Sequence, residues 1–119
     1  MVDNERRTGR TTRQIERCLD LLAKGESSIF VSRLHVASDV HMRMAFEMAA
    51  HLSPNAYLNK LTRAVFRAYE PGRIYFYGVE MFDGKQRKGS FRGMRFARVE
   101  FDHDVQQGRV SFEPYGGMV

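Results

Sequence analysis

The chain has 119 residues, of which 43% are hydrophobic and 28% charged, a composition typical of one globular domain. No stretch approaches the roughly 20 apolar residues that a membrane-spanning helix needs, and the charged start of the chain lacks the apolar segment of a secretory signal. The one cysteine excludes an internal disulfide. We therefore expect a single cytoplasmic domain over residues 1–119 that does not associate with a membrane.

Basic residues exceed acidic ones, and the formal net charge is +5. The excess is concentrated in a segment at 84–98, which has no acid, and in a cluster near the start of the chain. The first contains Lys85, Arg87, Lys88, Arg92, Arg95 and Arg98, and the second Arg6, Arg7, Arg10, Arg13 and Arg17. Clustered bases suit phosphate on a nucleotide or a nucleic acid, and the alternative is a solvated basic surface. We expect nucleic acid to be bound by Lys85, Arg87, Lys88, Arg92 and Arg95.

The first part of the chain predicts helices around one buried strand. Residues 11–24 form an amphipathic helix with Gly25 at its C-cap position, and Ser28–Ser32 is a short apolar strand. The apolar stripe of this helix is Ile15, Cys18, Leu19 and Leu22. A second helix, closed by Ser53 and Pro54, is marked by Val36, Val40, Met44, Met48 and Leu52. A third helix or helical turn, broken by Pro71 and Gly72, is suggested by Leu58, Leu61, Val65 and Tyr69.

The second part of the chain predicts strands. Residues 73–79 form a strand, a turn follows at Asp83-Gly84, and a basic loop occupies 85–95. Residues 96–102 alternate, with Arg98 and Glu100 on a face that we expect to be partly solvated. A short last strand is expected at 109–112. Helices between short strands predict an α/β fold, with a small, mainly parallel sheet covered by helices.

The segment Thr8-Gly9-Arg10-Thr11-Thr12 opens the first expected helix. In a phosphate-binding loop, a glycine-containing turn lets backbone N–H groups wrap a phosphate, a basic side chain reaches the phosphates, and a Ser or Thr hydroxyl holds magnesium. Gly9, Arg10, Thr11 and Thr12 are thus candidates for nucleotide or phosphate binding. The alternative is a threonine-capped helix start with a glycine nearby.

The strand at 96–102 ends in a second candidate site, at Asp102 and His103. An apolar strand that ends in an acid can hold magnesium, and the next residue, usually glutamate, positions a water molecule. Asp102 is placed for the first role and His103 for the second, as the catalytic candidates. The alternative is a strand that runs into a charged turn.

Taken together, these features resemble the ATPase core of phage terminase large subunits and related helicase-like P-loop proteins, in a shortened form. The resemblance covers residues 6–104 and implies a reduced P-loop NTPase-like core that binds ATP. By this resemblance Arg10 replaces the phosphate-binding lysine, and Thr11 and Asp102 would hold magnesium in the presence of nucleotide. The chain departs from the pattern, with Asn4 in place of the leading glycine and His103 in place of the catalytic glutamate.

Three hypotheses follow for the function. The first is a phage-type protein that binds nucleotide or nucleic-acid phosphates with a degenerate ATPase site, in the cytoplasm of the host cell. The second is a catalytically inactive module that binds nucleic acid or a host protein through its basic surface. The third is a subunit whose sheet is completed by another chain, in a complex or a homo-oligomer, since the expected fold lacks the strand that feeds the phosphate-binding loop.

Overall fold

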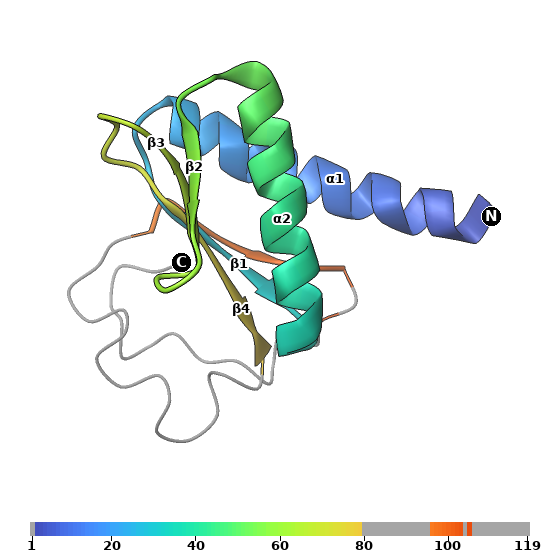
Figure 1. Ribbon diagram of the computed structural model, residues 1–119. Helices are drawn as coiled ribbons and strands as arrows, with labels where there is room; N and C mark the ends of the chain where they lie inside the picture. The colour runs from blue at the N-terminus through green and yellow to red at the C-terminus, as the bar shows by residue number, and fades with distance from the viewer. Residues whose placement is uncertain (1, 80–95, 104, 106–119) are drawn as a thin grey trace.

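The computed structural model describes residues 2–79, 96–103 and 105, with side-chain burial from residue 9 onward. The elements in chain order are α1 (Val2–Ala23), β1 (Ser28–Ser32), α2 (His35–Leu52), β2 (Ala56–Asn59), β3 (Ala64–Arg67), β4 (Ile74–Gly78) and β5 (Arg98–Phe101) (Figure 1). The expected α/β class is therefore confirmed. The basic loop predicted at 85–95 and the strand predicted at 109–112 lie outside the described residues.

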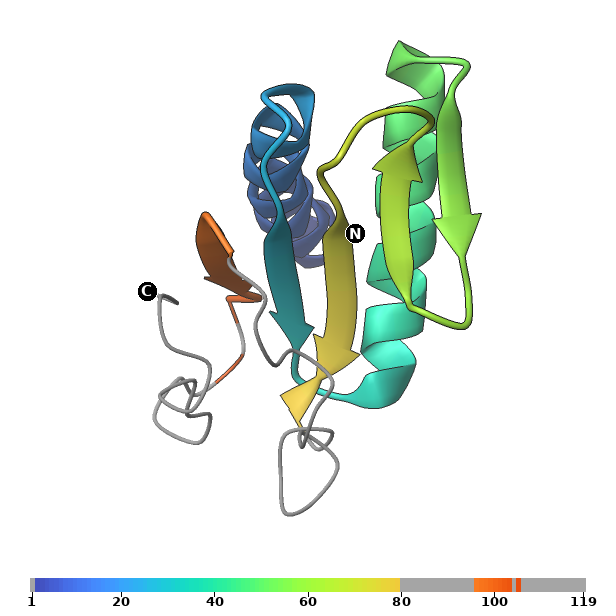
Figure 2. The same ribbon diagram turned by 90° about the vertical axis from the view of Figure 1, so that its left-hand side faces the viewer.

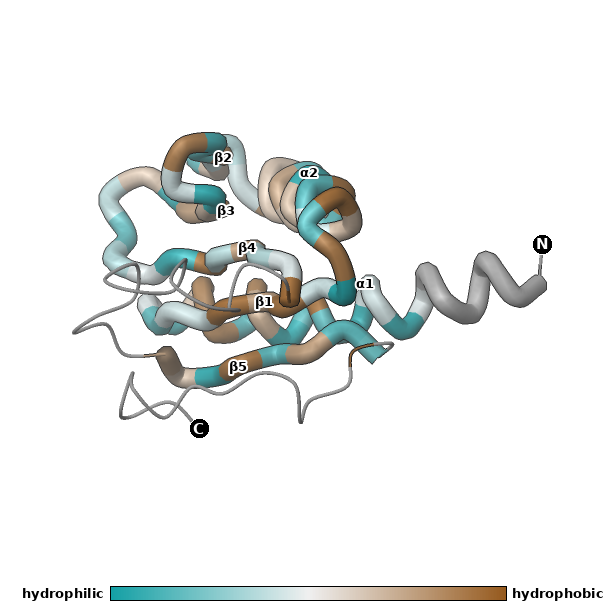
Figure 3. Tube along the Cα trace, turned by 90° about the horizontal axis from the view of Figure 1, so that it is seen from below, coloured by the Kyte–Doolittle hydropathy of each residue, from teal (hydrophilic) through white to brown (hydrophobic). Residues whose placement is uncertain are grey.

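The five strands form one sheet in the order β2-β3-β4-β1-β5. β1 lies between β4 and β5 (Figure 3). It pairs in parallel with both, so Phe30 has Phe76 opposite it on one side and Glu100 on the other. The prediction that 28–32, 73–79 and 96–102 share a sheet is thus confirmed. The prediction of a mainly parallel sheet is wrong, because β2 pairs with β3, and β3 with β4, in antiparallel fashion.

The third predicted helix is also wrong, since its residues form the β2–β3 hairpin. Their apolar spacing fits a helix, yet Leu61 is 95% exposed at the tip of the hairpin. The Asn59 side chain accepts the N–H of Leu61 at 2.9 Å, and Arg63 takes a positive φ of 56°, so local turn chemistry reverses the chain here. Tyr57 and Phe66 then stack across the two strands, with ring centroids 5.8 Å apart.

Both helices lie on the same face of the sheet (Figure 2). The main hydrophobic core fills the space between them and the strands, and the predicted stripe of the first helix is confirmed as part of it. The buried residues of this stripe are Ile15, Cys18, Leu19 and Leu22. Burial raises the pKa of the Cys18 thiol to about 11. A second cluster, on the opposite face, includes Ile29, Val31 and Phe96, so β1 is buried on both sides.

α2 confirms the second predicted helix, but its buried face is not formed by the apolar residues from which the sequence predicted that helix. The buried residues of α2 are Ser38, Met42, Ala45 and Ala49. The alanines bring the helix backbone close to the sheet because they are small. Of the residues that predict it, Val36, Val40 and Leu52 are 70%, 56% and 76% exposed. Val36, Val40 and Leu52 therefore stay exposed, whereas Met44 and Met48 of the same row are partly buried against the main core.

α1 ends where the sequence predicts but begins earlier. The N–H groups of Gly25 and Glu26 bond to the carbonyls of Leu22 and Leu21, both at 2.9 Å, and Gly25 has a φ of 80°, which together form a Schellman cap. The helix starts at Val2 rather than at residue 11, because residues 2–10 contain no proline and a single glycine. Neither described helix combines the length and apolar character needed to cross a membrane.

The end of β4 presses against the start of α2. A Cβ on Gly78 would lie 2.3 Å from the backbone nitrogen of His35, so only glycine fits there. This contact places the first turns of α2 beside the carboxyl ends of β1 and β4. The side chain of His41, on the second turn of α2, can therefore reach Ser32 at the end of β1.

Candidate functional site

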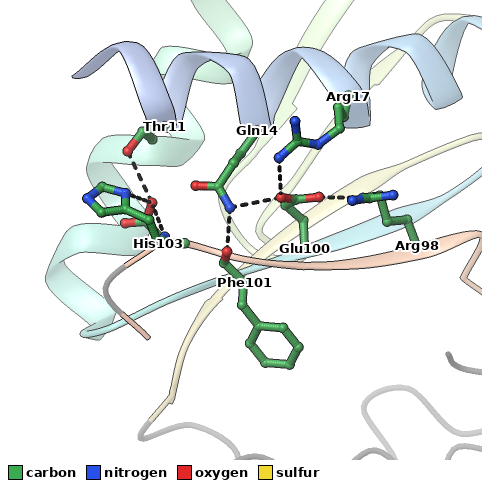
Figure 4. A network of polar contacts seen from close by, with 8 residues as sticks. Thr11, Gln14, Arg17, Arg98, Glu100, Phe101 and His103 are labelled. Carbon is green, nitrogen blue, oxygen red and sulfur yellow. Dashed lines mark hydrogen bonds and ion pairs between the residues drawn. The ribbon is translucent and has the colours of Figure 1, made fainter. Parts of the chain in front are cut away.

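A network of polar side chains lies where α1 passes over the end of β5 (Figure 4). The Thr11 hydroxyl donates a hydrogen bond to Asp102 Oδ1 at 3.1 Å. Both residues are buried, with exposures of 6% and 5%. The two residues to which the sequence assigns magnesium thus lie in contact, although 90 residues separate them along the chain.

Several groups besides Thr11 surround the Asp102 carboxylate. Oδ1 accepts the backbone N–H of His103 at 3.0 Å and lies 3.2 Å from His103 Nδ1. Oδ2 lies 3.7 Å from His41 Nε2, and the Asp102 N–H donates to the Val31 carbonyl at 2.9 Å, which extends the parallel pairing with β1. Asp102 is therefore fixed from α1, α2 and β1 at once.

The side chains of Ser32, His41 and Asp102 lie one after another in space, as the serine, histidine and aspartate of a hydrolase catalytic triad do. Ser32 Oγ and His41 Nδ1 are hydrogen-bonded at 2.6 Å. However, Ser32 is fully buried, and 3.7 Å separates His41 from Asp102. A nucleophile must reach its substrate, and a triad aspartate bonds the ring nitrogen that does not face the serine within ordinary hydrogen-bond distance. The arrangement thus connects α2 to the ends of β1 and β5, and we assign it no catalytic role.

Glu100, two residues before Asp102, accepts hydrogen bonds from three described side chains. Its Oε2 accepts Gln14 Nε2 at 2.8 Å and Arg17 Nη2 at 2.9 Å, and its Oε1 accepts Arg98 Nε. Burial by itself would raise the pKa of Glu100, but the bonds from Arg17, Arg98 and Gln14 outweigh it and hold that pKa below its ordinary value. The expectation of a partly solvated face at Glu100 is wrong, since α1 covers it.

Gln14 is the central donor of this network, and the sequence does not single it out. Its Nε2 also bonds to the Phe101 carbonyl, whereas its Oε1 is buried and has no hydrogen-bond partner. Thr11, Gln14 and Arg17 are spaced by three residues, so they share one face of α1 and meet β5 together. That polar spacing beside the apolar stripe is the signal that could have identified Gln14.

The candidate phosphate-binding segment lies inside α1. Gly9, Arg10, Thr11 and Thr12 are all helical, and Arg10 is exposed. In an α-helix, backbone N–H groups bond to carbonyls four residues earlier and are not free to bind an anion. The expected turn before the helix is therefore not formed, because the helix starts at Val2. Phosphate binding by these four residues stays a prediction.

The remaining site predictions fall into two groups. The nucleic-acid candidates, namely Lys85, Arg87, Lys88, Arg92 and Arg95, lie outside the described residues. His103 is described and follows Asp102 as expected, with its ring nitrogen directed to that carboxylate. It therefore interacts with the acid beside it, and its catalytic role stays a prediction.

Metal binding depends on what the chain itself can supply. Within residues 2–79, 96–103 and 105, the structure has no group of three or more His, Cys, Asp or Glu residues that could hold a metal ion. Thr11 and Asp102 offer a hydroxyl and a carboxylate, which are oxygen ligands of the kind that Mg²⁺ prefers. Mg²⁺ commonly takes one or two carboxylates and completes its shell with water and substrate phosphates. The pair therefore suits magnesium that arrives with a nucleotide.

Comparison with protein-family models, with curated proteins and with solved structures found no match to this chain.

Proposed function

We propose that the chain is a reduced, phage-type P-loop NTPase-like protein, which binds the phosphates of a nucleotide or a nucleic acid and hydrolyses ATP poorly or not at all. The observation that carries the proposal is the hydrogen bond between Thr11 and Asp102. A helix-borne hydroxyl against a strand-end carboxylate is the pair that such a site needs for Mg²⁺. The site also lies at the carboxyl end of parallel strands, where ligands bind in open α/β sheets.

The network around Thr11 and Asp102 also contains an acceptor without a partner among the described residues. Gln14 Oε1 is a buried acceptor without a partner in the network that holds Thr11 and Asp102, and such an atom is costly unless something donates to it or coordinates it. Thr11 and Asp102 would hold the ion, and Gln14 keeps β5 in place beneath them. When bound, Mg²⁺ would neutralise charge on the phosphates.

Phosphate binding requires the first turns of α1 to open, so that the amides of Gly9 to Thr12 become free. These turns extend beyond the sheet (Figure 1), and Arg10 is exposed. The end of a helix is its least stable part, and a glycine such as Gly9 weakens it by roughly 1 kcal/mol relative to alanine. The opening therefore costs little compared with unfolding the packed part of the helix. Arg10 would then supply a cation to the phosphates.

Poor hydrolysis follows from the groups around Asp102. Turnover needs a water molecule held in line with the phosphate that is transferred. Among the described acids of β5 and its end, Glu100 is bonded by two arginines and Gln14, and Asp102 is bonded by Thr11. His103 stands where a glutamate would position that water. No described carboxylate in this network is thus left to orient water.

A thermal-shift titration with Mg·ATP tests the proposal. A ligand at about five times its dissociation constant stabilises the fold by about 1 kcal/mol. We expect millimolar ATP with Mg²⁺ to raise the melting temperature by the amount that corresponds to this free energy. No phosphate release above background should accompany it. Thr11→Val and Asp102→Asn should abolish the shift, judged against the melting temperature of each unliganded variant. Thr62→Val and Asp20→Asn, which alter exposed residues elsewhere, should retain it.

Gly9→Ala separates the open from the helical form. Among the described side chains, a Cβ on Gly9 meets only Arg13 Nη1, at 3.9 Å, so alanine fits the helix and should stabilise the protein by about 0.5–1 kcal/mol. If the turn must open, the same change weakens nucleotide binding about two- to fivefold, by the same free energy. A variant that is more stable and binds Mg·ATP as tightly as wild type would refute the opening. Efficient hydrolysis lost in Asp102→Asn would refute the degenerate site.

A further inference from the structure

A groove lies between α1 and α2, lined by residues of both helices. Its volume is about 720 Å³, and apolar side chains from both helices line it. These apolar side chains are Leu19, Met44, Met48 and Leu52. The groove is separate from the Asp102 network, because none of the residues that line it belongs to that network. The proposed function makes no use of this groove.

α2 contributes a row of apolar side chains to the groove. Met44, Met48 and Leu52 follow one another at four-residue intervals and line it, whereas Val36 and Val40 continue the same spacing but, at roughly 40° of rotation per step, point away from it. Val36, Val40 and Leu52 are each more than half exposed. The part that lines the groove, from Met44 to Leu52, runs about 12 Å along the helix axis at 1.5 Å per residue. Exposed apolar side chains gathered along a surface groove favour an interaction site there.

Acidic residues border the groove. Glu16, Asp20 and Glu47 line it, and none of these three carboxylates forms an ion pair within the part of the chain that the structure describes. This is unusual for a chain with a net charge of +5, because basic side chains are plentiful elsewhere. Unpaired acids along an apolar groove favour a partner that carries both a hydrophobic side and positive charge.

We propose that this groove binds a basic amphipathic helix of another protein. A helix presents apolar side chains at three- and four-residue intervals, which match a strip of the same periodicity, and its flanking lysines or arginines would meet Glu16, Asp20 and Glu47. A second copy of this chain suits the groove less well. A two-fold symmetric contact would set the same acids of both copies against one another. Charge complementarity thus selects the cationic helix.

The test uses a fluorescent model peptide of about 18 residues, built from leucine and lysine with the leucines on one helical face. Its binding to wild type is measured by fluorescence anisotropy. The double variant Glu16→Lys with Glu47→Lys, and the single variant Leu52→Ser, should each weaken binding about tenfold. All three positions are exposed, so the fold should survive, which circular dichroism verifies. Leu61→Ser, at an exposed leucine of the β2–β3 turn, is the matched control and should bind as wild type does.

Two further peptides sharpen the result. A shuffled peptide of the same composition lacks an apolar face, and a leucine–glutamate version reverses its charge, so neither should bind. The proposal is overturned if the original peptide fails to bind, if the shuffled peptide binds equally well, or if the charge-reversed variant binds with unchanged affinity. It is also overturned if analytical ultracentrifugation reveals self-association that Leu52→Ser abolishes, because the occupant is then a second copy.

Discussion

Replacing Glu100 by glutamine tests the network that joins α1 to β5. The carboxylate accepts bonds from Gln14 and Arg17 on Oε2 and from Arg98 on Oε1. The glutamine amide has one acceptor oxygen, so its nitrogen must face a donor on one side. The least costly orientation leaves the oxygen with Gln14 and Arg17 and sets the amide nitrogen against Arg98. One bond is lost, the bond from Gln14 loses its ionised acceptor, and the bond from Arg17 loses the negative charge that makes it an ion pair.

The expected loss of stability follows from these contacts. Hydrogen bonds to charged groups contribute about 1.5–3 kcal/mol each. Arg17 and Arg98 are 48% and 46% exposed, so solvent screens their share, whereas Glu100 itself is buried. We therefore expect Glu100→Gln to lower the free energy of unfolding by about 2–3 kcal/mol, from a total of about 5–15 kcal/mol for a domain of this size. Glu47→Gln, at an exposed acid without an ion pair, should change it by less than about 0.5 kcal/mol.

The pH dependence gives a second readout. The pKa of Glu100 is lowered by folding from an ordinary value of 4.5, so its stabilising effect is complete above about that pH. The effect disappears as the pH falls through the pKa of the folded state. Urea unfolding should therefore give a constant difference between wild type and Glu100→Gln from pH 7 to pH 5, roughly, and a shrinking one below the ordinary pKa. A difference under 0.5 kcal/mol at pH 7, or one that persists unchanged in acid, would contradict the reasoning.

Two further outcomes test the packing. Gly78→Ala should destabilise the fold by about 3 kcal/mol or more. The added Cβ would lie 2.3 Å from the His35 nitrogen and 2.6 Å from the Leu34 carbonyl carbon, and neither backbone atom can move freely. A urea midpoint equal to that of wild type would show that α2 shifts at no cost. Cys18 is fully buried with a pKa raised to about 11, so a thiol reagent at neutral pH should modify the native protein far more slowly than the urea-unfolded chain, and equal rates in the two states would contradict the placement of the thiol in the core.

The fold is predictable from the sequence mainly where the residues of one segment determine the secondary structure of that segment. Ser28–Ser32 is a strand because five buried residues need neighbours on both faces, and α1 has a clear apolar stripe. The region of Leu58 and Leu61 fails this test, since its apolar spacing fits a helix and a hairpin equally. There the hydrogen bond to the Asn59 side chain and the pairing of Tyr57 with Phe66 make the segment a hairpin. The spacing of apolar residues does not reveal either interaction.

The candidate site is predictable residue by residue but not as a network. Thr11 and Asp102 stand out because each belongs to a short motif. Glu100 instead reads as the polar side of an alternating strand, and only the passage of α1 over β5 shows that it is buried. The role of His41 cannot be predicted from the sequence either, because its contact with Ser32 depends on where α2 begins. These positions result from contacts between segments that lie far apart in the sequence.

The central place of β1 has a consequence for the order in which the chain acquires its structure. The β2–β3–β4 part of the sheet is built from segments that are close in sequence. β1, in contrast, pairs with strands that come much later in the chain, since Ser28 lies opposite Ile74 and Arg98. Long closures are slow and come late in folding. We expect β5 to be the last strand to dock, both in refolding and as the chain leaves the ribosome. Until then one edge of a hydrophobic strand stays open to any other extended chain, and slow synthesis or a weakened β5 should increase aggregation.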